Sequence, residues 1–149
     1  MLRVNTERRF YPDLKIGVWR RRTYQQGGNS SPAQFQGRYG RRATDWFSFD
    51  LPADSAAPLL LVVTYNRDER ANRAFAVLVD GRKVGEQKIP RRSPQEKEGF
   101  FDVEYPLPAD LVAGKQKVTV RFEGLEGSET GTVYGIRIVR AGGRFIAKS

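Results

Sequence analysis

The sequence contains neither cysteine nor histidine. Without cysteine the chain cannot form disulfides, thiolate metal sites or cysteine nucleophiles. Without histidine it lacks the most common general base and the most common metal ligand of proteins. These two absences remove nucleophilic triads of the usual kinds and the usual zinc sites. The sequence therefore predicts a protein that is not an enzyme.

Long apolar segments are also missing. No apolar run approaches the roughly 18–20 residues that cross a bilayer as a helix, so no membrane partner is predicted. The first 22 residues are charged and lack the apolar centre of a secretory signal, and the sequence leaves the localisation open. Helical periodicity is absent as well; a single helical turn is expected at residues 108–114, closed by Gly114.

The positive charge of the chain is concentrated near its N-terminus. The net charge is +9, and residues 1–42 alone carry ten basic and two acidic side chains. Residues 1–33 are interpreted as a basic N-terminal arm or an extra strand, and residues 34–149 as the folded domain. Such an arm can bind phosphates or other polyanions, and Trp19 and Tyr24 stand near Arg20-Arg21-Arg22 as aromatics do in single-strand binders. No nucleic-acid-binding motif accompanies them, so a nucleic-acid or polyanion binder is kept as an alternative only.

The rest of the chain alternates between apolar and polar residues, as half-buried strands do. Polar and strand-breaking residues at 24–32 predict a loop, and residues 15–22 could form a short strand. Turn signals separate the later segments, which is typical of an all-β antiparallel β-sandwich of the jelly-roll-like kind. The expected strands are residues 44–51, 59–65, 74–79, 83–89, 100–107, 116–123 and 132–140.

Residues 59–81 are expected to form the centre of this sandwich. In residues 59–65 both alternating sets of side chains are apolar, which predicts a central strand covered on both faces. The second apolar run, residues 74–79, ends at Asp80-Gly81, a strong signal for a tight hairpin turn. Between the two runs lies a charged loop, residues 66–73, whose charges are typical of an exposed connection.

The order and spacing of many short motifs resemble a known family of domains. Over about residues 34–140 the chain resembles the C-terminal β-sandwich accessory domain of β-L-arabinofuranosidase-type glycoside hydrolases (glycoside hydrolase family 127), which is similar to carbohydrate-binding modules. The motifs that carry the resemblance are Gly37-Arg38-Tyr39-Gly40-Arg41-Arg42-Ala43, Trp46-Phe47-Ser48-Phe49-Asp50-Leu51, Leu61-Val62-Val63-Thr64-Tyr65, Arg73-Ala74-Phe75-Ala76-Val77-Leu78-Val79-Asp80-Gly81, Phe100-Phe101-Asp102, Tyr105-Pro106-Leu107-Pro108, Gly114-Lys115, Val118-Thr119-Val120-Arg121-Phe122 and Tyr134-Gly135-Ile136-Arg137.

The resemblance implies a non-catalytic carbohydrate-binding or accessory module of a glycoside hydrolase. Its expected partners are a carbohydrate or a glycoside hydrolase catalytic domain, and a second copy of the chain is a further candidate. The catalytic domain of that family, with its glutamate and zinc-bound cysteines, is absent from this chain. Proteins of the resembled family are often secreted or periplasmic. The alternative is a domain or subunit interface module without a ligand of its own.

Sugar binding requires aromatic faces beside planar polar side chains, and a small set of residues offers both. Trp46 is expected on the strand face opposite Phe47 and Phe49, although it could pack under a loop or against the second sheet. Tyr65 could bind a ligand or continue the core stripe of Leu61 and Val63. The candidate ligand-binding residues are Trp46, Tyr65, Asn66, Asp68, Arg73 and Tyr39.

Two further expectations concern ion pairs and cofactors. Arg73 could instead pair with an acid such as Asp102 and brace the loop at residues 66–73. A structural calcium ion, common in jelly-roll sugar binders, requires several converging oxygen ligands. The sequence shows no compact Asp/Asn/Gly cluster, so calcium is an alternative without support, and no cofactor or metal site is predicted.

Overall fold

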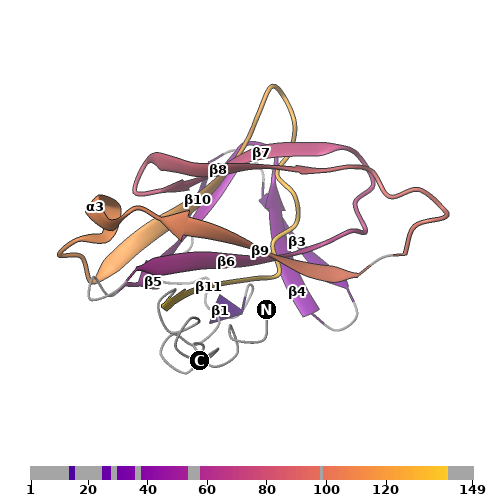
Figure 1. Cartoon of the computed structure of the whole chain (residues 1–149). Coiled ribbons are helices and arrows are strands. Elements are labelled where there is room, and N and C mark those ends of the chain that lie inside the picture. Colours follow the sequence, from indigo (N-terminus) through magenta and orange to yellow (C-terminus); the bar gives the residue numbers. More distant parts are fainter. Residues whose placement is uncertain are drawn as a thin grey trace, which may run out of the picture.

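The chain forms two antiparallel sheets and a separate hairpin (Figure 1). The structure is a computed structural model, and it describes residues 14–15, 25–27, 30–35, 38–53, 58–97 and 99–140. A four-stranded sheet has the order β1 (Leu14–Lys15), β11 (Gly135–Arg140), β6 (Leu59–Asn66), β9 (Phe100–Leu107). A five-stranded sheet has the order β2 (Gln25–Gly27), β5 (Trp46–Pro52), β10 (Lys117–Gly124), β7 (Arg73–Val79), β8 (Arg82–Ile89). The hairpin is β3 (Ser30–Phe35) and β4 (Arg38–Ala43), and one helical turn, α3, covers Ala109–Val112.

The two larger sheets pack face to face as a β-sandwich, which confirms the predicted fold class. From β5 to β11 the chain passes repeatedly from one sheet to the other, and every strand pair is antiparallel. The expected strands from residue 44 onward are all present, with ends that differ by up to three residues. The alternation of apolar and polar residues was therefore sufficient to find them.

Strand β6 is central in its sheet, as its two apolar faces predicted. It pairs with β11 on one side and with β9 on the other, and all eight of its residues are buried. Leu61, Val63 and Tyr65 lie in the core between the sheets, whereas Leu60 and Val62 form a second small apolar cluster with Val139.

Aromatic side chains fill much of the space between the sheets. Phe47 of β5 stacks on Phe122 of β10 with ring centroids 5.2 Å apart, and Phe49 meets Phe47 edge to face. Phe75 of β7 reaches across to Tyr65 of β6, with ring centroids 5.6 Å apart. Burying one such side chain contributes roughly 1.5–3 kcal/mol relative to leaving it exposed. The inward row of β5 is thus fixed by packing, which forces Trp46 outward.

The hairpin between β7 and β8 turns at Asp80-Gly81, as predicted. Both residues have positive φ angles, 49° at Asp80 and 83° at Gly81, which is the geometry of a two-residue turn that matches the strand twist. The Asp80 carboxylate also accepts a 2.8 Å hydrogen bond from the Thr119 amide of β10. The turn therefore closes one hairpin and joins it to the next strand.

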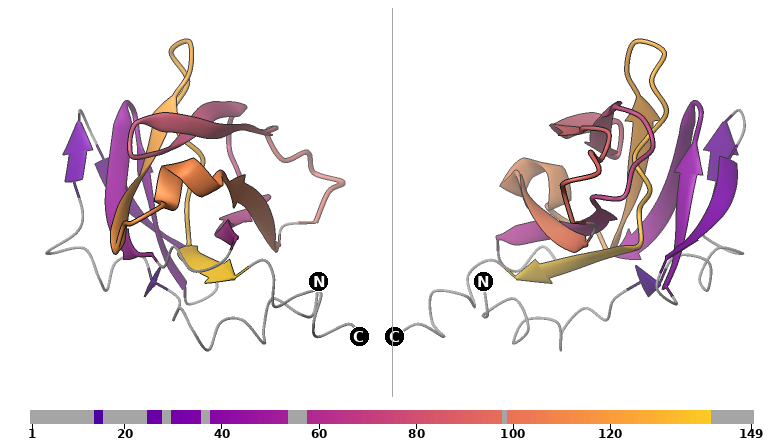
Figure 2. Two further views of the ribbon diagram at one scale, coloured as in Figure 1. Left: turned by 60° about the vertical axis from the view of Figure 1, so that its left-hand side comes forward. Right: turned by 90° about the vertical axis from the view of Figure 1, so that its right-hand side faces the viewer.

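The expectation that residues 24–32 form a loop was wrong at residues 25–27 and 30–32. Gln25–Gly27 is strand β2, paired with β5, and Ser30–Phe35 is strand β3, paired with β4. Main-chain pairing needs no apolar side chains, and Pro32 is tolerated because β3 belongs to a two-stranded ribbon with an open edge. The β3–β4 hairpin lies at one side of the two sheets (Figure 2).

Most of the basic arm lies outside the described residues. Of the possible strand at residues 15–22, only Lys15 is described, in β1, where Leu14 pairs with Ile136 of β11. Trp19, Arg20-Arg21-Arg22 and Tyr24 are not described. The division of the chain at residues 33 and 34 falls within β3 and stays a prediction.

Candidate functional site

Trp46 lies on the outer face of the five-stranded sheet. Its neighbours Phe47 and Phe49 point into the core and are fully buried, so Trp46 points away from the core, as expected. The indole is half-buried, and the Arg121 guanidinium of β10 lies over its ring, with Cζ 4.1 Å from the ring centroid. The ring therefore does not pack between the sheets, and part of it remains accessible.

Arg121 and Glu123 of β10 lie beside this indole, and Asp50, Thr119 and Lys117 lie further along the same face. Arg121 Nε lies 3.1 Å from Glu123 Oε1. Asp50 Oδ1 accepts a 2.7 Å hydrogen bond from the Thr119 hydroxyl, and Asp50 Oδ2 lies 3.5 Å from Lys117 Nζ. An aromatic face beside fixed, planar hydrogen-bonding groups is the arrangement that sugars require. We call Trp46, Asp50, Thr119, Arg121 and Glu123 the outer-face cluster.

The sequence-based search missed Arg121 and Glu123. Alternation in β10 places both residues on the side opposite Val118, Val120 and Phe122, so the sequence predicts that they point outward. Alternation does not predict that β10 pairs with β5. This pairing sets Glu123 opposite Trp46 and Arg121 opposite Ser48.

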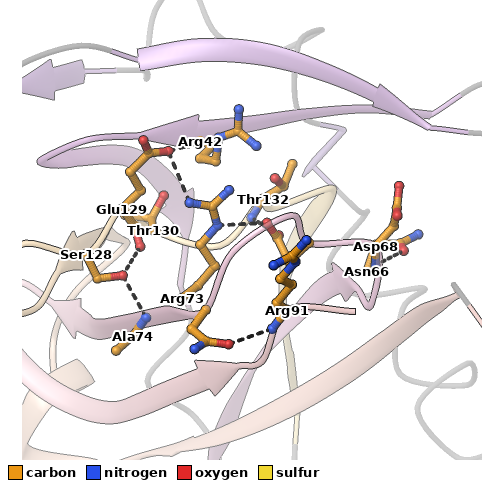
Figure 3. A network of polar contacts seen from close by, with 12 residues as sticks. Arg42, Asn66, Asp68, Arg73, Ala74, Arg91, Ser128, Glu129, Thr130 and Thr132 are labelled. Atoms are coloured by element: carbon orange, nitrogen blue, oxygen red, sulfur yellow. Dashed lines mark hydrogen bonds and ion pairs between the residues drawn. The ribbon is translucent and has the colours of Figure 1, made fainter. Parts of the chain in front are cut away.

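Asn66 and Asp68 lie together in a different place, in the loop at residues 66–73 (Figure 3). The Asn66 side chain is 1% exposed, and its Oδ1 accepts hydrogen bonds from the amides of Asp68 at 2.8 Å and Gly99 at 3.4 Å. The Asp68 carboxylate accepts a 3.1 Å hydrogen bond from Arg92 Nε. Both residues thereby connect this loop to residues 90–99.

Arg73 braces the same loop, but through acids other than the one expected. Its Nε donates a 3.0 Å hydrogen bond to Glu69 Oε1, and its Nη1 lies 3.4 Å from Glu129 Oε1 (Figure 3). Asp102 instead accepts hydrogen bonds from Thr64 and Arg137 on the four-stranded sheet. The expected Arg73–Asp102 pair was therefore wrong, because the two residues belong to different sheets.

Glu69 is the anchor of this network. It is only 2% exposed, although its sequence context is that of an exposed connection, and its Oε2 accepts a 2.8 Å hydrogen bond from the Thr132 amide. Glu129 extends the network to β4, since its Oε1 lies 3.3 Å from Arg42 Nε. The network thus joins residues 66–73, residues 124–134 and the β3–β4 hairpin.

Tyr65 points into the core, and Tyr39 is described only by its backbone. Tyr65 is 0% exposed and continues the core stripe of Leu61 and Val63, and its hydroxyl lies 2.7 Å from that of Tyr105. Burial, together with the contact to Tyr105, raises the pKa of Tyr65 well above its usual value. Such a position gives a ligand no access to Tyr65. Tyr39 lies in β4 opposite Gln34, and only its backbone is described.

An open cleft of about 610 Å³ lies beside the loop at residues 66–73. Its described lining is Arg91, Arg92, Ser93 and Pro94. The Arg91 amide donates a 2.8 Å hydrogen bond to Asn72 Oδ1, so the wall of the cleft is tied to the loop. Within the described ranges, no three Asp, Glu, His or Cys side chains are grouped so that they could hold a metal ion. Nor does any described helix have the length and apolar character needed to cross a bilayer.

Comparison with known families gives one match. A family model described as a family of unknown function, DUF6805, matches residues 24–139. Among curated protein sequences, none matches this chain.

Solved structures share the fold at low sequence identity. A family 35 carbohydrate binding module from an environmental isolate has 13% identity and a TM-score of 0.59, covering 87% of this chain and 93% of that one. The CBM36-1 domain of a multidomain xylanase from the hindgut metagenome of Trinervitermes trinervoides has 9% identity and a TM-score of 0.60, covering 88% and 98%. An exo-beta-1,3-galactanase from Phanerochaete chrysosporium has 11% identity and a TM-score of 0.59; the match covers 85% of this chain but 28% of the enzyme. The chain thus has the β-sandwich fold of carbohydrate-binding modules.

Proposed function

The chain belongs to the DUF6805 family, and from this premise and its fold we propose that it is a non-catalytic carbohydrate-binding module. The ligand lies against Trp46, on the outer face of the five-stranded sheet. The observation that carries the proposal is a half-buried indole that points away from the core, with the Arg121–Glu123 pair fixed beside it. Apolar ring faces stack on the C–H faces of sugars, while the paired side chains are available to sugar hydroxyls.

The chemistry of the outer-face cluster supports binding rather than catalysis. Glycoside hydrolysis uses two carboxyl groups, one of which donates a proton while the other acts as nucleophile or base. Asp50 and Glu123 are the carboxylates of this cluster, and each is held by a basic side chain. Both carboxylates therefore act as fixed partners of basic side chains, as the polar groups of a binding surface do.

We further propose that the module serves a glycoside hydrolase, by holding it near its substrate. The support is the resemblance of its motifs to the accessory domain of the arabinofuranosidase-type enzymes. In the galactanase named above, a domain of this fold occupies a minor part of an enzyme chain.

Affinity electrophoresis of the full chain through gels that contain soluble polysaccharides tests the proposal. Trp46→Ala is expected to lose retention, at least about tenfold in Kd, because it removes the stacking surface. Trp46→Phe keeps a flat ring and is expected to retain part of the affinity. An unchanged thermal unfolding midpoint in both variants separates lost binding from lost fold.

Two results would count against the proposal in different ways. If the wild-type chain is retained by none of the polysaccharides, the module has no carbohydrate ligand among them and the binding function fails. If retention survives Trp46→Ala but is lost in Arg91→Ala, the binding function stands and its site is the cleft beside residues 66–73.

A further inference from the structure

The two charged residues of β10 beside Trp46 form an ion pair with each other. Arg121 and Glu123 form an ion pair of 3.1 Å, and their side chains are 36% and 43% exposed. Both groups are therefore accessible to a ligand, yet neither is an isolated charge. Because the guanidinium also lies over the indole, the pair is held in place from two sides.

The remaining carboxylates on this face are paired as well. Asp50 is held by Lys117 and by the Thr119 hydroxyl. On β8, Glu86 pairs with Lys83. Each of the carboxylates of Asp50, Glu86 and Glu123 is thus paired with a basic side chain, and none of the three is an isolated negative charge.

Strand β7, which pairs with β10 on the side away from β5, places apolar side chains on the outer face. The strand register sets Ala76 of β7 opposite Glu123, and Leu78 opposite Arg121. The next strand, β8, brings Glu86 opposite Ala76. From β5 to β8 three strand spacings of roughly 4.8 Å give a surface about 14 Å wide, which can receive a chain of several sugars.

The excess positive charge of the protein lies elsewhere in the sequence. Residues 1–42 hold a net +8, whereas residues 43–149 hold sixteen basic and fifteen acidic side chains. The outer-face cluster belongs wholly to the second, nearly neutral part. Within the cluster the charges are matched, since Asp50 pairs with Lys117 and Glu123 with Arg121. The cluster therefore offers no excess positive charge to an acidic ligand.

From these observations, and on the basis of the proposed carbohydrate-binding function, we infer that the Trp46 site takes an uncharged polysaccharide. Its rings stack on Trp46, the Glu123 carboxylate accepts hydrogen bonds from its hydroxyls, and the Arg121 guanidinium donates to them. A uronic acid at this site would bring its carboxylate close to Glu123, and the charge of Arg121 is already compensated. Two carboxylates that lie close together repel each other, so acidic sugars are disfavoured at this site.

The test measures how binding depends on the charge of the polysaccharide and on the salt concentration. The full chain is titrated with three neutral polysaccharides, arabinan, galactan and xylan, and with polygalacturonate, at about 0.05 and about 0.5 M NaCl. We expect Trp46-dependent binding to at least one neutral polysaccharide, with a Kd that changes by less than about twofold between the two salt concentrations, because no net charge is neutralised. Trp46→Ala in each series separates binding at this site from binding of polyanions to the basic arm.

Two variants test the roles of the ion pair. Arg121→Gln removes the charged donor and is expected to weaken neutral binding about tenfold. Glu123→Gln leaves the guanidinium uncompensated, so it is expected to create Trp46-dependent binding of polygalacturonate that disappears at high salt. Asp110→Asn, which breaks the exposed pair with Arg82 at another position on the molecule, is the matched control and is expected to change neither binding.

The outcomes separate this inference from the proposed function. If polygalacturonate binds more tightly than every neutral polysaccharide and Trp46→Ala abolishes that binding, the site takes acidic glycans; the inference is wrong and the carbohydrate-binding function stands. If Glu123→Gln changes neither the preference for neutral over acidic polysaccharides nor the salt dependence of binding, Glu123 does not exclude acidic ligands from the site. If no polysaccharide shows Trp46-dependent binding, the inference fails together with the proposed site.

Discussion

Tyr65 and Tyr105 form a buried chain of hydroxyl groups inside the sandwich. Their oxygens are 2.7 Å apart, and the Tyr105 hydroxyl donates a 2.9 Å hydrogen bond to Gln87 Oε1. Burial raises the pKa of Tyr105 to about 12, and it raises that of Tyr65 well above the usual value. The folded state therefore holds both phenolic protons more tightly than the unfolded chain, whose tyrosines titrate near 10.

This difference predicts a loss of stability in alkali. Below about pH 10 the folded and unfolded states both keep the phenolic protons, and the contribution of the two tyrosines to stability is fully present. This contribution falls as the pH rises from about 10 toward about 12, because the unfolded chain loses its phenolic protons first. Tyr105→Phe removes one of the two groups, so its free energy of unfolding should decline less steeply over that range. Urea unfolding of both proteins in steps from about pH 9 to about pH 12 provides the measurement. Parallel declines would contradict the assignment.

At the scale of single residues, the sequence predicted orientation but not neighbours. The outward position of Trp46 followed from the apolar residues that alternate with it. The same alternation allowed Tyr65 to be a core residue, and the structure places it there. Arg121 stands 75 positions after Trp46, and only the pairing of β10 with β5 brings it over the indole. Contacts of that kind depend on strand order, which alternation does not encode.

At the scale of elements, the loop at residues 66–73 is held by a buried carboxylate. Glu69 accepts from Arg73 and from the Thr132 amide, and it has almost no contact with solvent. Glu69→Gln removes the charge that compensates the buried guanidinium, while its shape is kept. We expect a loss of about 1–3 kcal/mol in the free energy of unfolding, because a buried charge is left with a weaker partner.

Denaturant titration of Glu69→Gln beside Asp110→Asn measures this effect. Asp110 makes an ion pair with Arg82 at the surface, and its loss is expected to leave the unfolding midpoint almost unchanged. Equal midpoints for the two variants would show that Glu69 is not an anchor of the loop.

Strands were predictable from sequence where one face is apolar, and not where pairing is the main cause of structure. β5, β7, β9 and β10 show clear alternation because one of their faces packs in the core. β2 and β3 are polar and contain glycine or proline, so their sequence signals a loop. They are strands because β5 and β4 offer unpaired amides and carbonyls beside them, and an unpaired backbone group is costly to bury.

At the scale of the whole molecule, the excess positive charge and the outer-face cluster belong to different parts of the sequence. The basic residues are concentrated in residues 1–42, and the outer-face cluster lies in the nearly neutral remainder. Replacing Arg20, Arg21 and Arg22 by glutamine should lower the salt concentration at which the protein elutes from heparin, since fewer counterions are displaced. The Trp46-dependent affinity for neutral polysaccharides should not change. A parallel loss of both activities would mean that the arm belongs to the sugar site.

The central position of β6 also bears on how the protein can be produced. Its residues, Leu-Leu-Leu-Val-Val-Thr-Tyr-Asn, form an uncharged segment of high strand propensity without proline, and both of its edges are covered only by strands that come later in the chain, β9 and β11. In a chain that ends before residue 100, both edges of this segment would lack their partner strands. The composition of the segment is that of an aggregation-prone strand. Soluble expression of the module therefore depends on including the chain through Arg140, and shorter versions are expected in the insoluble fraction.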